Sequence, residues 1–393
     1  MPRMDGMGEP IAGARPTEPG RLQRGLPAHF LLGFAIASIG GPLALLSFAA
    51  PTADGLVVLL ALLVFVAPLA IWVAFSGRIA SAGGLSAFVE AAAGRPAAVA
   101  HAWIWALAYF LYLPYTITFV VYDLLPPVFP GIHAYRAALE LLVPVVIAGL
   151  VFLPVRAVLA ALGILGAAQV VALLVVGGFE LSHAGASFAS HPELDATGRA
   201  TGGAALLFVC ASLPLYFGAE VRGGGRTMQR TLVASLAIVG AAFLVSAIPL
   251  GAVPESLRNA PVPGAAIARA YSGRGLEIVV GLLTAGGTLA LVVAEYLALA
   301  RLLRWLHGIP LRTSYAWIAV PFIALDAISL VNPDRFYDDA LKPSLGALFV
   351  SQLVVFLVFP RFRRNVAALA AALIASGLAG WGLYTLIAGS AAT

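Results

Sequence analysis

The chain has 393 residues, of which 61% are hydrophobic and 10% are charged, and its formal net charge is +5. This composition excludes an ordinary soluble domain and is typical of a polytopic α-helical membrane protein. The positive charge is therefore no sign of nucleic-acid binding, because arginines in such proteins sort by membrane side. The single cysteine, Cys210, excludes an internal disulfide and a cysteine metal cluster.

The chain begins with a polar segment, residues 1–26, that holds four arginines among glycines and prolines. It lacks the apolar core of a signal peptide, so we expect a cytoplasmic tail. Eleven apolar stretches, each long enough to cross a bilayer as a helix, follow it. They are predicted at 28–50, 55–76, 97–125, 136–154, 157–179, 203–221, 231–252, 276–304, 313–331, 343–360 and 366–388.

Arginines lie mainly in alternate connections between these stretches. Because positive residues stay in the cytoplasm, we expect the N-terminus inside and, with eleven spans, the C-terminus outside the cytoplasmic membrane. Segment 77–96 is too polar and glycine-rich to span, and we expect it on the cytoplasmic side. The loop 253–275 carries three arginines, although the count places it outside. Its sequence predicts a short helix on the outer face.

The first span is interrupted at its centre by Ser38, Ile39, Gly40, Gly41 and Pro42. Two glycines weaken a helix, and the proline cannot donate an N–H to it. Backbone groups freed in the membrane must face protein, a ligand or a watery cavity. Two interpretations follow: a kinked structural helix, or a broken helix that lines a transport site.

The sixth span has its midplane near Cys210, Ala211, Ser212, Leu213 and Pro214. The proline removes the N–H that would bond to the Cys210 carbonyl, which predicts a break at 210–214 and leaves Glu220 in the inner loop. Breaks five spans apart are expected of an inverted 5+5 repeat. We therefore expect repeats at 27–200 and 201–360 and an additional helix in 361–393, with an ordinary proline kink as the alternative.

These breaks suggest a ligand chemistry. N–H groups around Gly40 and Gly41 would lie at the N-terminus of a half-helix, where a carboxylate is favoured. Carbonyls freed near Cys210 and Ala211 would suit an ammonium group. Tyr109 and Tyr112 of the third span are candidate aromatic contacts, although single tyrosines more often serve packing.

Four sequence motifs occur in the order found in one transporter family. They are AGGLSAFVEAAAGRP at 82–96, IGGPLALLSF at 39–48, the acidic and basic residues at 220–230, and the arginine-to-proline run at 300–310. Together these motifs resemble the amino acid–polyamine–organocation permeases. The resemblance implies a LeuT-like fold and amino acid transport. The chain departs from the family in having eleven spans, where twelve are common, and in lacking its helix-six motif.

Glu295 is the acid that the sequence places deepest in the inner half of the membrane. An ionised group at this depth is costly without a partner, so Glu295 is either a proton-coupling carboxylate or a structural partner of a buried polar group. Six residues separate it from Arg301, a spacing that does not favour a bond along the helix. Thr288 could contribute a hydroxyl to a sodium site, whereas the fifth span offers only Gln169 where related permeases have a lysine.

The sequence therefore predicts a secondary active transporter that moves an amino acid or related amine by alternating access. Transport would be coupled to H+ or Na+ or occur by exchange, with no organic cofactor, no resident metal and no nucleic acid. The expected partners are a small-molecule substrate and the lipid bilayer. The alternatives are a membrane scaffold or receptor-like protein and an intramembrane enzyme. An enzyme would need a catalytic constellation at membrane depth, and the sequence suggests none.

Overall fold

The structure is a computed structural model that describes residues 25–190 and 193–390. Within these ranges, eleven helical stretches are long and apolar enough to cross a membrane, which confirms the predicted number. Most boundaries agree within a few residues. The sixth stretch, however, begins at Leu194 and the tenth at Pro333, each about three turns before the prediction. The expected tail, 1–26, lies almost wholly outside the described residues.

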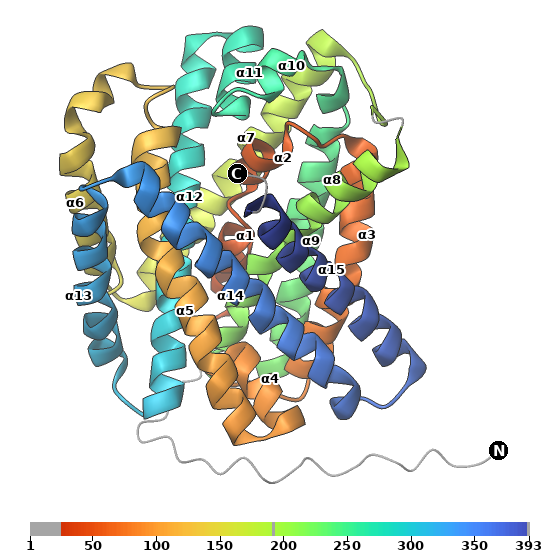
Figure 1. Ribbon diagram of the computed structural model, residues 1–393, viewed down its shortest axis with the longest axis vertical. Coiled ribbons are helices and arrows are strands. Elements are labelled where there is room, and N and C mark those ends of the chain that lie inside the picture. The colour runs from red at the N-terminus through yellow and green to blue at the C-terminus, as the bar shows by residue number, and fades with distance from the viewer. Residues whose placement is uncertain (1–24, 191–192, 391–393) are drawn as a thin grey trace.

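Nearly every described segment is helical, as Figure 1 shows. In chain order the elements are α1 (Ala28–Ser38), α2 (Pro42–Ala49), α3 (Gly55–Ser76), α4 (Gly84–Ala93), α5 (Arg95–Phe119), η1 (Val120–Leu124), η2 (Pro130–Tyr135), α6 (Arg136–Leu150), α7 (Val155–Ala184), α8 (Leu194–Leu206), η3 (Val209–Phe217), α9 (Gly224–Ala247), η4 (Leu250–Ala252), α10 (Glu255–Arg258), α11 (Pro263–Ser272), α12 (Arg274–His307), α13 (Leu311–Ser329), α14 (Pro333–Phe362) and α15 (Val366–Ser390).

The first span is broken where the sequence predicted. Helix α1 ends at Ser38, and α2 begins at Pro42. Gly40 and Gly41 have φ angles of +62° and +64°, a left-handed conformation that favours glycine. Pro42 occupies the first position of α2, where its missing N–H is not needed.

The sixth span is also broken, and the predicted break at 210–214 lies within the longer segment, 207–217, that is not α-helical. Helix α8 ends at Leu206, a turn follows at 207–208, and 209–217 continue as the 3-10 helix η3. Pro214 disfavours an α-helix in this segment, because its ring would clash with the Cys210 carbonyl. In a 3-10 helix the bond lost at a proline is the one to the third residue before it, so the carbonyl freed by Pro214 is that of Ala211.

Two short helices, α4 and α11, mark opposite ends of the bundle in Figure 1. Each precedes a long helix, and each ends at a glycine with positive φ: Gly94 at +86° and Gly273 at +94°. An arginine follows each glycine and begins α5 or α12. Equivalent elements at opposite ends are what an inverted repeat requires, whereas the repeat boundaries at residues 200 and 360 stay a prediction. We call these ends the α4 end and the α11 end.

Helix α1 lies at the centre of the bundle and packs tightly against α7. A Cβ added to Gly33 would lie 2.8 Å from the Gly163 Cα, and one added to Gly166 would lie 3.0 Å from the Ala37 nitrogen. Small residues let helix backbones approach closely in membrane proteins. The α1–α7 contact is therefore a contact between backbones.

Candidate transport site

The two broken spans meet at their breaks. A Cβ added to Gly40 would lie 3.4 Å from the Leu207 carbonyl oxygen, where α8 ends. One added to Gly41 would lie 3.1 Å from Gln169 Oε1 and 3.3 Å from the Gly287 carbonyl oxygen. The break in the first span is thus enclosed by the break in the sixth and by α7 and α12.

Only some of the backbone groups at this junction form hydrogen bonds within the described part of the chain. The Gly40 N–H donates to Ser38 at 2.9 Å, and the Gly41 carbonyl accepts from Ala44 at 2.8 Å and from Leu45 at 3.2 Å. No hydrogen bond from the Gly41 N–H is found among the described residues. This N–H lies at the N-terminus of α2, where the helix dipole favours an anion.

Three residues that the sequence singled out lie together between α5, η3 and α12. Glu295 is fully buried, and the Cys210 thiol donates to its Oε1 at 4.0 Å. The Tyr109 hydroxyl lies 3.9 Å from the Cys210 sulfur. Glu295 Oε2 has no hydrogen-bond partner in the described part of the chain. The structure therefore contains a buried carboxyl group beside the unwound part of the sixth span, and its Oε2 can still accept a hydrogen bond.

Aromatic side chains of α5 lie on one side of this carboxyl group. Tyr112 and Tyr115 both lie within electrostatic range of Glu295, and their rings meet edge to face at 4.9 Å. Trp105 packs on Tyr109 with ring centroids 4.1 Å apart. Sequence reasoning missed Tyr115. The repeat of tyrosine every third residue on one helix was the available signal, because such residues share a face.

The other predicted site residues have local roles. Ser38 donates to the Ala35 carbonyl at 3.0 Å, and Ser212 donates to Val209 at 3.1 Å. The Thr288 hydroxyl donates to Thr284 at 2.9 Å on its own helix. These hydroxyl protons are thus engaged within helices. The remaining predicted residues are buried at the two breaks: Ile39, Pro42, Ala211, Leu213 and Pro214.

The α4 end below this junction is held by an ion pair that the sequence did not predict. Arg301 Nε donates to Glu220 Oε1 at 2.6 Å, and Nη2 donates to Oε2 at 3.1 Å. Glu220 lies in the turn between η3 and α9, as expected, and its side chain is buried in a bidentate pair. Its backbone carbonyl also accepts from Leu26 at 3.1 Å, and Arg222 donates to the Leu26 carbonyl at 3.0 Å. The start of α1 is thereby tied to the segment after η3.

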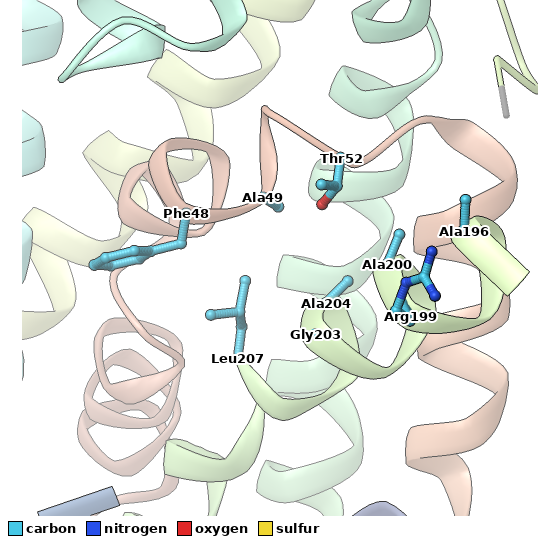
Figure 2. Close-up of a pocket in the computed structure, with 9 residues that line it drawn as sticks. All are labelled: Phe48, Ala49, Thr52, Ala196, Arg199, Ala200, Gly203, Ala204 and Leu207. Carbon is cyan, nitrogen blue, oxygen red and sulfur yellow. The ribbon is translucent and has the colours of Figure 1, made fainter. Parts of the chain in front are cut away.

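The α11 end has a cavity of about 390 Å³ between α2 and α8, shown in Figure 2. The cavity is lined by Phe48, Ala49, Thr52, Ala196, Arg199, Ala200, Gly203, Ala204 and Leu207. One of these lining residues, Leu207, also contributes the carbonyl oxygen beside Gly40, so the cavity borders the meeting point of the two breaks.

A second buried acidic group lies away from the breaks, between α5, α6 and α13. Glu140 Oε1 accepts from the Thr118 hydroxyl at 2.5 Å and from the Ser329 hydroxyl at 2.7 Å. Asp326, one turn before Ser329, is fully buried, and neither of its carboxyl oxygens has a partner among the described residues. This group is part of the outer helices and does not line the junction.

Comparison with protein families finds no matching family model, and comparison with curated proteins finds no match. Solved structures do match. MhsT in complex with L-phenylalanine has a TM-score of 0.60 and 14% identity, covering 91% of this chain and 97% of MhsT. Two mutants of the Eremococcus coleocola manganese transporter have TM-scores of 0.51 and 0.53 at 14% identity, each covering 92% of this chain and 87% of the transporter.

These similarities establish a fold, whereas the resemblance to amino acid–polyamine–organocation permeases stays a prediction. The chain is a multi-pass membrane protein with the LeuT-like fold.

Proposed function

We propose that this chain is a secondary active transporter that moves an amino acid or a related amine across the cytoplasmic membrane. The observation that carries the proposal is the meeting of two broken helices at Gly40 and Leu207, below a cavity that leads in from one end. Discontinuous helices in transporters place unpaired backbone groups where a substrate binds. The match to MhsT, whose structure contains L-phenylalanine, supports an amino acid as the cargo.

Alternating access requires that one end be closed while the other is accessible. The α4 end is closed by the Arg301–Glu220 pair, and the α11 end has the cavity. In this proposal the arginine bias places the α4 end in the cytoplasm, with the N-terminus inside and the C-terminus outside. The structure then corresponds to a state accessible from outside. Coupling would use H+ at Glu295 or Na+ near Thr288.

A divalent metal is the second candidate cargo, because two matching structures are of a manganese transporter. The residues at the junction favour an amine. The described residues contain no group of three or more histidine, cysteine, aspartate or glutamate side chains that could hold a metal ion. At the junction, Glu295 and Cys210 would have to bind the metal with backbone carbonyls.

A block in the cavity tests the proposal. A Cβ added to Gly203 meets nothing within 4 Å, so Gly203→Trp should fill the cavity without disturbing the fold. We expect it to abolish uptake of a substrate found by a thermal-shift screen of amino acids and amines, while the melting temperature stays unchanged. Gly198→Trp is the matched control, because Gly198 is on the same helix, has equal space and does not line the cavity. Normal uptake by Gly203→Trp would reject the cavity as the access route.

A further inference from the structure

The Glu295 carboxyl group has the features of a site for a cation. It is fully buried, and one of its two oxygens has no partner in the described structure. Burial of a carboxylate without a counter-charge is strongly unfavourable, and the Cys210 thiol at 4.0 Å is only a weak donor. A ligand cation would supply the missing charge.

The arginine on the same helix does not supply it. Arg301 directs Nε and Nη2 to Glu220 and Nη1 to the Leu297 carbonyl at 2.9 Å, so its guanidinium is already engaged. By contrast, tyrosine hydroxyls lie near Glu295, and the Tyr109 oxygen, 3.9 Å from the Cys210 sulfur, can accept a hydrogen bond from a cation. Carboxylate and hydroxyl groups together suit an ammonium or guanidinium group.

The spacing along α12 indicates where that cation sits on the ligand. Gly41, with its unpaired N–H, lies against Gly287, and Glu295 is eight residues further along the helix, about 12 Å at the helical rise. Helical side chains lean towards the N-terminus, so the carboxyl group reaches part of the way back towards Gly287. The α-ammonium of an amino acid is adjacent to its carboxylate and cannot bridge this separation. An extended lysine side chain carries its charge roughly 6 Å beyond Cα. This length fits the distance that is left between the Gly41 N–H and the Glu295 carboxyl group.

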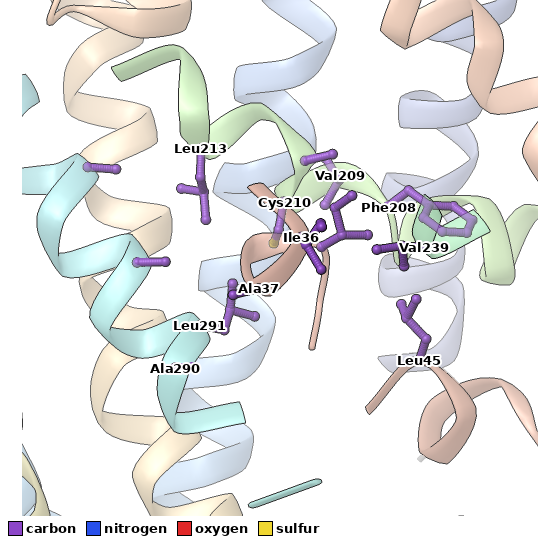
Figure 3. Close-up of a cluster of buried hydrophobic side chains, with 14 of the residues drawn as sticks. Ile36, Ala37, Leu45, Phe208, Val209, Cys210, Leu213, Val239, Ala290 and Leu291 are labelled. Carbon is purple, nitrogen blue, oxygen red and sulfur yellow. The ribbon is translucent and has the colours of Figure 1, made fainter. Parts of the chain in front are cut away.

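The surface between the two points is apolar. Leu291 lies one turn from Gly287 and one turn from Glu295, and it is buried. Figure 3 shows it in one cluster with Ala37 of α1 and with Cys210 and Leu213 of η3. Methylene groups of a long cationic side chain pack favourably on such a surface.

Building on the proposed function, we propose that the substrate is a basic amino acid. Its α-carboxylate would lie at the Gly41 N–H, its methylenes along Leu291, and its terminal cation between Glu295 and the tyrosines. In this arrangement Glu295 holds the substrate's cation and does not carry a coupling proton.

Binding to the purified full-length protein tests this inference, with lysine and ornithine compared with norleucine, which has the lysine chain without the terminal amine. We expect norleucine to bind at least about tenfold more weakly, because the buried carboxyl group would stay unpaired. Glu295→Gln should lose most lysine affinity and keep that for norleucine. Glu90→Gln, at a surface ion pair, is the control and should bind as the parent does.

Each other result contradicts the inference in a different way. If norleucine or phenylalanine binds as tightly as lysine, the substrate class is wrong although the transport proposal stands. If Glu295→Gln binds lysine normally but fails to concentrate it, Glu295 is the coupling group. If the parent protein binds and transports no amino acid or amine, the proposed function itself fails. Should Glu295→Gln not fold, the ratio of lysine to norleucine affinity in the parent protein decides.

Discussion

The α4 end and the α11 end of the molecule are built from equivalent halves, yet they differ in how they are closed. At the α4 end, the buried acid Glu220 is paired in two hydrogen bonds with Arg301. At the α11 end, α2 and α8 are separated by a cavity, and the buried acid Glu277 pairs with Arg274 at 2.7 Å and with Arg269 at 3.5 Å. Both ends therefore contain a buried acid paired with arginine, and they differ in that Arg301 is itself buried whereas Arg269 and Arg274 are exposed.

The largest expected effect comes from Arg301→Ala, which leaves Glu220 buried without its counter-charge. Breaking one side of a buried ion pair typically costs about 3–5 kcal/mol. We expect a large drop in melting temperature or a shift to a state open at the α4 end, measured by unfolding and by cysteine accessibility. Arg312→Ala, an exposed arginine at the same end, is the control and should change neither. A variant indistinguishable from the parent would mean that the pair does not close this end.

Replacing both partners sharpens that result. Buried ion pairs can often be exchanged for apolar residues without loss of stability. We therefore expect Glu220→Met combined with Arg301→Met to recover most of the melting temperature. If the α4 end stays closed in this double variant, apolar packing holds it and the ion pair does not.

Gly41→Leu should have the next largest effect, at the junction between the two ends. A leucine here would be held at an unfavourable φ of +64°, and its Cβ would lie 3.2 Å from the Gly287 carbonyl carbon. Strain of this kind costs about 1–3 kcal/mol, and the ligand's carboxylate position would be filled. We expect lower stability together with loss of ligand-induced stabilisation. Gly178→Leu, which meets nothing within 4 Å, is the control. Retained ligand binding would place the site elsewhere.

A smaller effect is expected from Asp326→Asn, because this buried acid has no partner to lose in the described structure. Removing an unpaired buried charge should leave the free energy of unfolding unchanged or raise it by about 1 kcal/mol. Glu140→Leu, in contrast, removes the acceptor of two hydroxyl donors and should cost about 1–2 kcal/mol. Thermal unfolding of both variants checks this order, and a strongly destabilised Asp326→Asn would reveal a cation bound there.

The smallest effect is expected from Arg199→Ala at the cavity. Arg199 pairs with Asp195 one turn away on α8, and both side chains are largely exposed. Exposed pairs of this kind contribute about 0.3–0.5 kcal/mol. We expect a melting temperature within about one degree of the parent's. A change comparable to that of Arg301→Ala would mean that this exposed pair is a main stabilising contact of the α11 end.

The sequence predicted those features that depend on neighbouring residues. The spans follow from apolar length, and the break at Gly40 and Gly41 follows from local conformational preference. The predicted break in the sixth span, 210–214, covers only part of the segment that is not α-helical, because the prediction relied on Pro214 and the middle of the apolar stretch. The 3-10 geometry that precedes it depends on packing against α1 and cannot be read from the proline.

Contacts between distant segments could not be predicted in the same way. Glu220 and Arg301 are 81 residues apart, and Cys210 and Glu295 are 85 apart. The sequence identified all four residues and assigned the first two to separate motifs, because nothing local indicates that a loop acid turns inward. The paired Gly-Arg steps at the starts of α5 and α12 were a signal of the repeat that sequence reasoning overlooked.

The backbone contact between α1 and α7 has a mechanical consequence. Helices joined by interlocking side chains must change rotamers to slide past one another, whereas Gly33 and Gly163 present nearly smooth surfaces. We therefore expect α1 to tilt along α7 without rotamer changes at these glycines. The hydrogen bonds of Leu26 to Glu220 and Arg222 must break before the junction can open at the α4 end. We therefore expect the rate of opening to be controlled at the start of α1 and not along its length.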